Sequence, residues 1–298
     1  MTQVTLLDGG IGQEIVRKSG DQPTPLWSTQ VMVDRPGIVE SVHRDYFGAG
    51  ATVATTNTYA IHKDRFGGTA LNGRFKELIG MACNEASKAR EAHRSGRIAG
   101  AIGPLGASYR PDLVPDPEEA AVIIGELVEL LEPHVDLLII ETTSSVAAAE
   151  GALRGCANSD KPVWLAVTVM DDDGSKLRSG EPLGKLAGVV HKYQPAAVLV
   201  NCSTPEAIEE SLEIVQAFGK PFGAYANGFV KISDSFLEEK PTVDVLETRS
   251  DLGPAEYADF AMRWVAMGAT IIGGCCETTP AHIAEIARRL DRSGFKIV

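Results

Sequence analysis

Eight short apolar segments of the type that forms β-strands alternate with longer helical patterns along the chain. Several strand segments are apolar on both faces, which is typical of parallel strands covered by helices. Eight strands that are each followed by a helix predict an α/β fold, the (β/α)8 or TIM barrel, as a single domain over residues 1–298. The strand segments are 4–8, 52–57, 97–103, 136–141, 163–170, 196–201, 221–226 and 269–274. The helical patterns are 36–49, 71–94, 116–132, 145–157, 182–192, 205–217, 254–267 and 280–292.

An open doubly wound sheet is the alternative architecture, and it usually carries a phosphate-binding loop. The chain contains neither G-x-G-x-x-G nor G-x-x-x-x-G-K-[ST]. A length of 298 residues suits one large core. Residues 227–253 form a long loop insertion after the seventh strand, and loops of this length in compact domains are often functional.

Charge and cysteine content restrict the partners and the compartment. The formal net charge of −12 argues against nucleic acid or an anionic membrane as a partner. No stretch reaches the ~18 continuous apolar residues of a membrane span, and the N-terminal segment does not resemble a signal peptide. Five cysteines in a chain of this size favour a reducing compartment with free or metal-bound thiols. We expect a cytoplasmic protein that acts on small-molecule substrates, and both a monomer and a homo-oligomer are open alternatives.

Three cysteines follow predicted strands. Cys202 follows the sixth strand, and Cys275 and Cys276 follow the eighth. Because the active site of a barrel lies at the carboxyl ends of its strands, we expect the three sulfur atoms to converge. Three thiolates form a strong site for Zn²⁺ and leave one coordination position open for chemistry. For the adjacent pair, buried thiols or a vicinal disulfide are the alternatives.

Other polar residues are predicted at the same rim of the barrel. Asp8 ends the first strand, Glu141 ends the fourth and Asn227 follows the seventh. A carboxylate at the end of an apolar run needs a partner, and the ammonium group of a ligand would serve Glu141. Gly9 and Gly10 allow backbone N–H groups to approach an anion such as a substrate carboxylate. The alternative role for Asp8 is a turn or a helix cap.

Several motifs spread over nearly the whole chain carry a family pattern. They are DGG at 8–10, LW at 26–27, VHRDYFGAGATVATTNTYA at 42–60, GPLGAS at 103–108, IIET at 139–142, NCSTP at 201–205, YAN at 225–227 and GGCC-x-T-x-P-x-HI at 273–283. With these motifs the chain resembles the homocysteine S-methyltransferase family, zinc-dependent barrels that methylate homocysteine to methionine. The separated NC and GGCC motifs are the specific part of this resemblance.

The resemblance implies a role for each candidate residue. Cys202, Cys275 and Cys276 would bind Zn²⁺, and the homocysteine thiolate would take the open position. The chemistry agrees, because a free thiol with a pKa of ~8.5 is mostly protonated near neutral pH and coordination to zinc deprotonates it. The amino-acid end of homocysteine would be held by Asp8, Gly9, Gly10 and Glu141. Asn227 occupies the position of a temporary fourth ligand.

The identity of the methyl donor is predicted less directly. The betaine-using branch of the family has aromatic residues at positions that are Ala60 and Thr142 here. Trp27 remains as an aromatic residue of the donor pocket, with Tyr59 or Phe229 as further candidates, so the aromatic cage is incomplete. A sulfonium donor, S-methylmethionine or S-adenosylmethionine, is therefore favoured. Glu277 follows the cysteine pair where Arg or Gly is common, and its role is open. The alternatives are another acceptor thiol, a catabolic donor such as betaine or dimethylsulfoniopropionate, or a non-catalytic zinc or thiol sensor.

Overall fold

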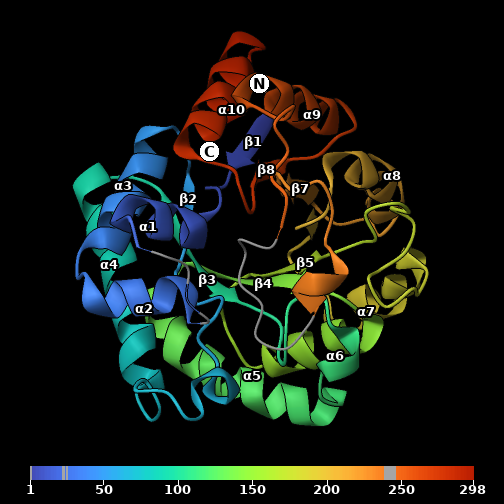
Figure 1. Cartoon of the computed structure of the whole chain (residues 1–298). Helices are drawn as coiled ribbons and strands as arrows, with labels where there is room; N and C mark the ends of the chain where they lie inside the picture. The colour runs from blue at the N-terminus through green and yellow to red at the C-terminus, as the bar shows by residue number, and fades with distance from the viewer. Residues whose placement is uncertain (1, 22–23, 25, 238–245) are drawn as a thin grey trace.

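Parallel strands curl into a barrel that is covered by helices, as the sequence predicts (Figure 1). The computed structural model describes residues 2–21, 24, 26–237 and 246–298. The strands run in the order β2-β3-β4-β5-β6-β7-β8-β1, and a parallel bridge between Leu7 and Val53 closes the barrel between β1 and β2. The strands are β1 (Gln3–Leu6), β2 (Val53–Thr55), β3 (Arg97–Ile102), β4 (Leu137–Thr143), β5 (Val163–Val167), β6 (Ala197–Asn201), β7 (Phe222–Ala226) and β8 (Ile271–Gly274). The TIM-barrel prediction is confirmed.

Helices follow the strands at the predicted positions, and two further helices precede β2. The helices are α1 (Ile11–Ser19), α2 (Trp27–Asp34), α3 (Ile38–Gly48), α4 (Phe75–His93), α5 (Pro117–Leu131), α6 (Val146–Gly155), α7 (Leu186–Tyr193), α8 (Pro205–Gln216), α9 (Pro254–Ala266) and α10 (Pro280–Arg292). The sequence analysis did not predict α1 and α2, which are short and have no capping side chain at their N-termini. It also missed β9 (Lys296–Ile297), a two-residue strand that pairs with β1 outside the barrel.

Alternate residues of the strands face opposite sides of the barrel wall. The inward set combines small and large side chains, including Ala99, Ala101, Trp164, Ala166 and Tyr225, and it fills the barrel. The outward set packs with the helices in the main hydrophobic core. This two-sided burial explains why the strand segments read as nearly continuous apolar runs.

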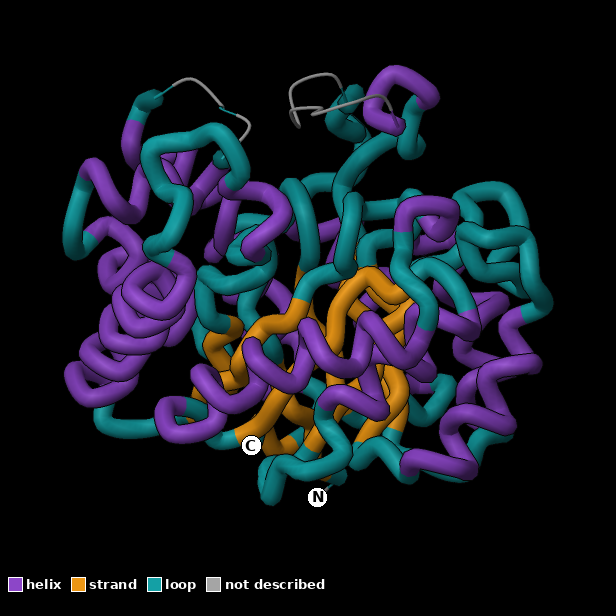
Figure 2. Tube along the Cα trace, turned by 90° about the horizontal axis from the view of Figure 1, so that it is seen from below, coloured by secondary structure: helices purple, strands orange, loops and turns teal. Residues whose placement is uncertain are grey.

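Both chain ends lie at the amino-terminal side of the barrel, and long connections extend beyond the carboxyl ends of the strands (Figure 2). Within the described part of the chain, no helix is long and apolar enough to cross a membrane. The β7–α9 connection (residues 227–253) begins and ends side by side, because Val230 N–H donates to Glu247 O and Arg249 N–H donates to Gly228 O. Residues 238–245 of this predicted insertion lie outside the described residues.

Candidate active site

A cavity of about 1230 Å³ opens at the carboxyl ends of the strands. Its wall comes from the segments after β1, β2 and β3, from the carboxyl ends of β4, β6, β7 and β8, and from the β7–α9 connection. Most of the predicted site residues line it, namely Asp8, Gly9, Gly10, Trp27, Glu141, Cys202, Cys275 and Cys276. Asn227 does not line it. The predicted rim of polar strand ends therefore forms one continuous pocket.

The three predicted sulfur ligands converge at one wall of this cavity. The Sγ atoms of Cys202, Cys275 and Cys276 all lie within 4.8 Å of one another. A tetrahedral thiolate site with Zn–S bonds of about 2.3 Å places its sulfur atoms about 3.8 Å apart, so the cluster can hold a metal ion. Burial, together with the negative charges of Glu277 and Glu141, raises the pKa of the Cys276 thiol to about 12. That thiol is neutral near pH 7 unless a bound cation stabilises its thiolate.

Cys202 and Cys275 are joined by a disulfide, while Cys276 is free. This differs from the free or metal-bound thiols expected from the sequence. Sulfur atoms that converge to share one metal ion are also near enough to bond to each other. The bonded pair and the three-thiolate site are therefore alternative states of the same side chains.

Strained backbone is concentrated around the cavity. Four cavity-lining residues other than glycine have left-handed backbone: Trp27 with φ 47°, Tyr109 with φ 62°, Thr142 with φ 56° and Cys202 with φ 46°. Glu277, which follows the cysteine pair, has φ 64°. Such conformations cost of order 1 kcal/mol each and persist where the surrounding structure fixes them, which is characteristic of functional sites.

A bulge in β4 aims Glu141 into the cavity. The register with β5 shifts between Ile140 and Thr143, which places Glu141 and Thr142 in the bulge. Asn201, at the end of β6, fixes it: its Oδ1 accepts from Thr142 N–H at 3.0 Å, and its Nδ2 donates to Thr142 Oγ1 at 3.1 Å. The sequence analysis ended this strand at residue 141, because a bulge has no distinct sequence signal here.

Two carboxyl groups reach the cavity without a cationic partner among the described residues. Asp8 accepts hydrogen bonds from Thr55 N–H at 2.6 Å and from Thr55 Oγ1 at 3.0 Å, and burial raises its pKa well above the ordinary value. Glu141 accepts from the Tyr225 hydroxyl at 2.9 Å, and burial raises its pKa to about 7. Burial disfavours the ionised form of each carboxyl group. A ligand cation placed between the two groups would stabilise that form and would therefore be strongly attracted.

Gly9 and Gly10 lie against the loop that carries the cysteine pair. A Cβ at Gly9 would lie 2.5 Å from the Thr278 carbonyl oxygen, and a Cβ at Gly10 would lie 2.8 Å from the Cys275 carbonyl oxygen. The Gly10 N–H donates to Thr278 O at 2.9 Å and so is already used. Both glycines therefore allow the β1 and β8 loops to approach closely. Anion binding by the Gly9 N–H stays a prediction.

Aromatic side chains form much of the remaining wall. Trp27 and Tyr59 meet edge to face with ring centroids 6.5 Å apart, and Tyr109 meets Phe236 in the same way at 5.9 Å. Phe229 also lines the cavity. Trp27 is the predicted aromatic residue of this pocket, while Ala60 and Thr142 stand at two positions where aromatic residues are expected. Tyr109 and Phe236 come from other loops, which only the fold brings together.

Asn227 lies behind the sulfur cluster, outside the cavity wall. Its side chain is 1% exposed, its Oδ1 accepts from Phe229 N–H at 3.2 Å, and its Nδ2 has no hydrogen-bond partner among the described residues. The neighbouring Ala226 O accepts from Cys275 N–H, and Gly228 N–H donates to Cys276 O. Asn227 thus lies in the segment that positions both cysteines, and its role as a ligand stays a prediction.

Glu277 is held by Gln13 rather than projecting freely beside the cysteines. Gln13 Nε2 donates to Glu277 Oε1 at 2.5 Å, and Gln13 Oε1 accepts from Glu277 N–H at 2.6 Å. This reciprocal pair ties the loop after β8 to α1. Gln13, Thr55, Tyr109, Tyr225 and Phe236 were not among the predicted site residues, because their importance depends on contacts between segments distant in the sequence.

The chain is similar to known proteins over nearly its whole length. The sequence profile described as Homocysteine S-methyltransferase matches residues 5–290. The chain is 31% identical to homocysteine S-methyltransferase of Escherichia coli (strain K12), over 96% of this chain and 95% of the relative. It is 25% identical to selenocysteine Se-methyltransferase of Brassica oleracea var. italica, over 96% of this chain and 88% of the relative. The crystal structure of the metallated form of the homocysteine methyltransferase MmuM from E. coli is similar with a TM-score of 0.80 at 29% identity, covering 96% of each chain.

Proposed function

Because this chain belongs to the homocysteine S-methyltransferase family, we propose that it transfers a methyl group from a sulfonium donor to homocysteine held at the cysteine cluster. S-methylmethionine and S-adenosylmethionine are the favoured donors, and the product is methionine. The observation that carries this proposal is the convergence of Cys202, Cys275 and Cys276 within 4.8 Å at the edge of a large cavity.

The cysteine cluster suits zinc, with soft sulfur donors and one side open to the cavity. Zinc bound there would keep the acceptor thiol ionised and nucleophilic near neutral pH. Ligation requires the three cysteines as thiolates, so the Cys202–Cys275 disulfide must be reduced first. Zn²⁺ with three thiolates would give the site a net charge of −1, which favours methyl transfer to a soft nucleophile over hydrolysis.

The remaining residues would orient the two substrates. The homocysteine ammonium group would lie between the carboxylates of Asp8 and Glu141, which have no cationic partner in the described chain. The aromatic wall around Trp27 and Tyr59 would face the positively charged methyl donor. In the transfer itself, the homocysteine sulfur forms a bond to the methyl carbon as the donor's S–CH3 bond breaks. The electron pair of that bond stays on the donor sulfur, which leaves as a neutral thioether.

The test measures methionine formation from homocysteine by reduced, zinc-loaded protein. S-methylmethionine, S-adenosylmethionine, dimethylsulfoniopropionate and betaine are offered separately. Turnover with a sulfonium compound supports the proposal, whereas turnover with betaine alone would refute the choice of donor. Absence of methionine with all four donors, with one zinc bound per chain, would refute homocysteine methylation by these donors.

A second acceptor is suggested by the similarity to selenocysteine Se-methyltransferase. A selenol is a soft nucleophile like a thiol and would fit the same cluster. Competition between selenocysteine and homocysteine, measured as the ratio of kcat/KM, identifies the preferred acceptor.

A further inference from the structure

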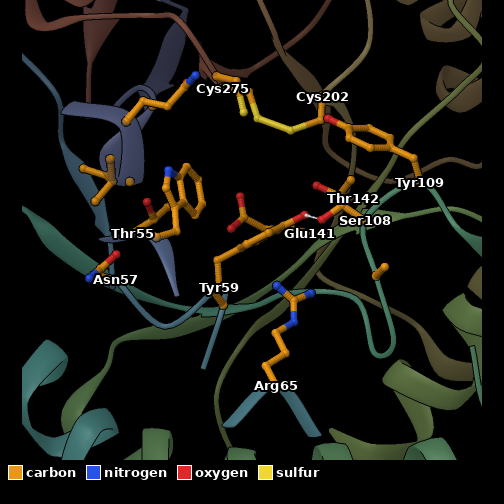
Figure 3. Close-up of a pocket in the computed structure, with 18 of the residues that line it drawn as sticks. Thr55, Asn57, Tyr59, Arg65, Ser108, Tyr109, Glu141, Thr142, Cys202 and Cys275 are labelled. Carbon is orange, nitrogen blue, oxygen red and sulfur yellow. Dashed lines mark hydrogen bonds between the residues drawn. A yellow bond between two sulfur atoms is a disulfide. The ribbon is translucent and has the colours of Figure 1, made fainter. Parts of the chain in front are cut away.

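Arg65 is a cavity residue to which neither the sequence pattern nor the proposed reaction assigns a role. It lies in the 3-10 helix η1 (Lys63–Phe66), in the connection after β2, and lines the cavity. Figure 3 shows its guanidinium group extending towards Tyr59 and Glu141, on the opposite side of the view from Cys202 and Cys275. The cavity therefore has a cationic group away from its sulfur cluster.

The guanidinium group of Arg65 has few hydrogen-bond partners among the described residues. Among the described residues it makes one hydrogen bond, from Nη2 to the Pro104 carbonyl at 3.3 Å, and no ion pair; its Nε is buried without a partner. Leaving such a donor unpaired costs about 1–3 kcal/mol. Arg110, which also lines the cavity, is instead paired with Asp112 at 2.6 Å. Arg65 is thus the arginine of the described wall that is available to a ligand.

The neighbours of Arg65 do not neutralise its charge. Burial and then the Arg65 charge lower the pKa of His62 to about 3, so this imidazole is neutral near pH 7. Burial raises the pKa of Tyr59 to about 12, so its hydroxyl is also neutral. Neither Asp8 nor Glu141 forms an ion pair with Arg65. The cavity therefore presents carboxylates and, at a separate place, a guanidinium group that forms no ion pair with the described residues.

We propose that Arg65 binds the carboxylate of the methyl donor and so selects zwitterionic donors, which carry a methylated cation and a carboxylate in one molecule. A guanidinium group pairs with a carboxylate through two parallel hydrogen bonds, which fixes orientation as well as position. The donor would then lie with its carboxylate at Arg65, its methylated cation against the aromatic wall and its methyl group towards the cysteines. This inference rests on the proposed function and specifies its donor class.

The test compares S-methylmethionine with its carboxamide, which has the same sulfonium group but no carboxylate. In the wild-type protein we expect kcat/KM to be about 30-fold higher for S-methylmethionine, the range for a charge-assisted pair. Arg65→Met should lower kcat/KM for S-methylmethionine about 30-fold and change that for the carboxamide less than threefold. Arg65→Lys should restore part of the preference for S-methylmethionine. Arg292→Met, which removes an exposed arginine at the end of α10, is the control and should leave kcat/KM unchanged for both compounds.

Two kinetic results would overturn the inference. If Arg65→Met lowers kcat/KM equally for S-methylmethionine and its carboxamide, the role of Arg65 is structural. A higher KM for homocysteine with an unchanged KM for S-methylmethionine would assign Arg65 to the acceptor.

Binding measured by calorimetry, in zinc-loaded protein without homocysteine, separates this inference from the proposed function. Tighter binding of S-methylmethionine than of its carboxamide, lost in Arg65→Met, supports the carboxylate site even if no methionine forms in any assay. Equal binding of both compounds by the wild-type protein, or no binding of either, would refute the site even if homocysteine is methylated.

Discussion

The residues that surround the cavity shift the pKa values of polar groups that line it. Glu141 projects from a bulge fixed by Asn201, and burial raises its pKa to about 7. Burial also raises the pKa of the Cys276 thiol to about 12. Burial of these groups costs folding free energy, and a bound cation would stabilise their ionised forms.

Cys275→Ser should abolish metal binding and methyl transfer together, because a hydroxyl is a poor substitute for a thiolate as a zinc ligand. Zinc per chain, measured by atomic emission on reduced protein, should fall from about one to near zero. Cys156→Ala is the matched control, since Cys156 is buried at the end of α6, outside the cavity. Turnover by zinc-free Cys275→Ser protein would contradict the proposed mechanism.

The raised pKa of Glu141 predicts a pH dependence of homocysteine use. The ionised carboxylate attracts the substrate ammonium and the protonated acid does not, so kcat/KM for homocysteine should fall about tenfold per pH unit below pH 7. Glu141→Gln should lower kcat/KM at pH 8 about 30-fold and remove this step from the pH profile. If the step persists in Glu141→Gln, another group is responsible for it.

Among the elements, the β7–α9 connection contributes Phe229, Phe236 and Leu246 to the cavity wall. Asp171 holds its first half: the carboxylate pairs with Arg178 at 2.7 Å and accepts from Ile232 N–H at 2.9 Å. Arg178 in turn lies over the ring of Tyr109 at 5.1 Å, and Tyr109 contacts Phe236 from the connection. The predicted insertion is therefore part of the cavity wall.

Asp171→Asn should loosen this connection without unfolding the barrel, because it weakens a partly buried ion pair and one backbone hydrogen bond. Hydrogen–deuterium exchange of a peptide covering residues 228–237 should become about tenfold faster, equivalent to about 1.4 kcal/mol. Asp173→Asn is the control from the same acidic turn, because Asp173 pairs with Lys176 and makes no hydrogen bond or ion pair with the described residues of the connection. Equal exchange in both variants would show that Asp171 does not anchor it.

At the scale of the whole molecule, the site depends on closure of the barrel. The sulfur ligands come from β6 and β8, which both pair with β7, while Asp8 follows β1 on the other side of β8. Gly223 of β7 faces Ile271 of β8 so closely that a Cβ would overlap the Ile271 carbonyl oxygen. The spacing of these strands therefore sets the distance between the ligands.

Gly223→Ala should destabilise the protein by about 3 kcal/mol or more, because backbone must move to admit the methyl group. Gly80→Ala in α4 should instead stabilise it by about 0.5–1 kcal/mol, since nothing lies within 4 Å of a Cβ there and alanine favours helix. Urea unfolding monitored by circular dichroism measures both. Similar stabilities for the two variants would contradict the strand packing described here.

The sequence by itself determined the barrel and the cysteine cluster. Apolar strand segments and helical patterns are local properties, and parallel strands place their carboxyl ends on one rim whatever their packing. A shared site could therefore be predicted from the residues at or just after the strand ends, namely Asp8, Glu141, Cys202, Cys275 and Cys276.

Only the tertiary structure decided which groups these residues meet. It placed Thr55 beneath Asp8, Tyr225 beside Glu141 and Asn227 behind the cavity wall. It also joined Cys202 to Cys275 and brought Arg65 to the cavity without an ion-pair partner among the described residues. The physical reason is that loop paths and side-chain directions depend on contacts between segments far apart in the chain, which have no local pattern in the sequence.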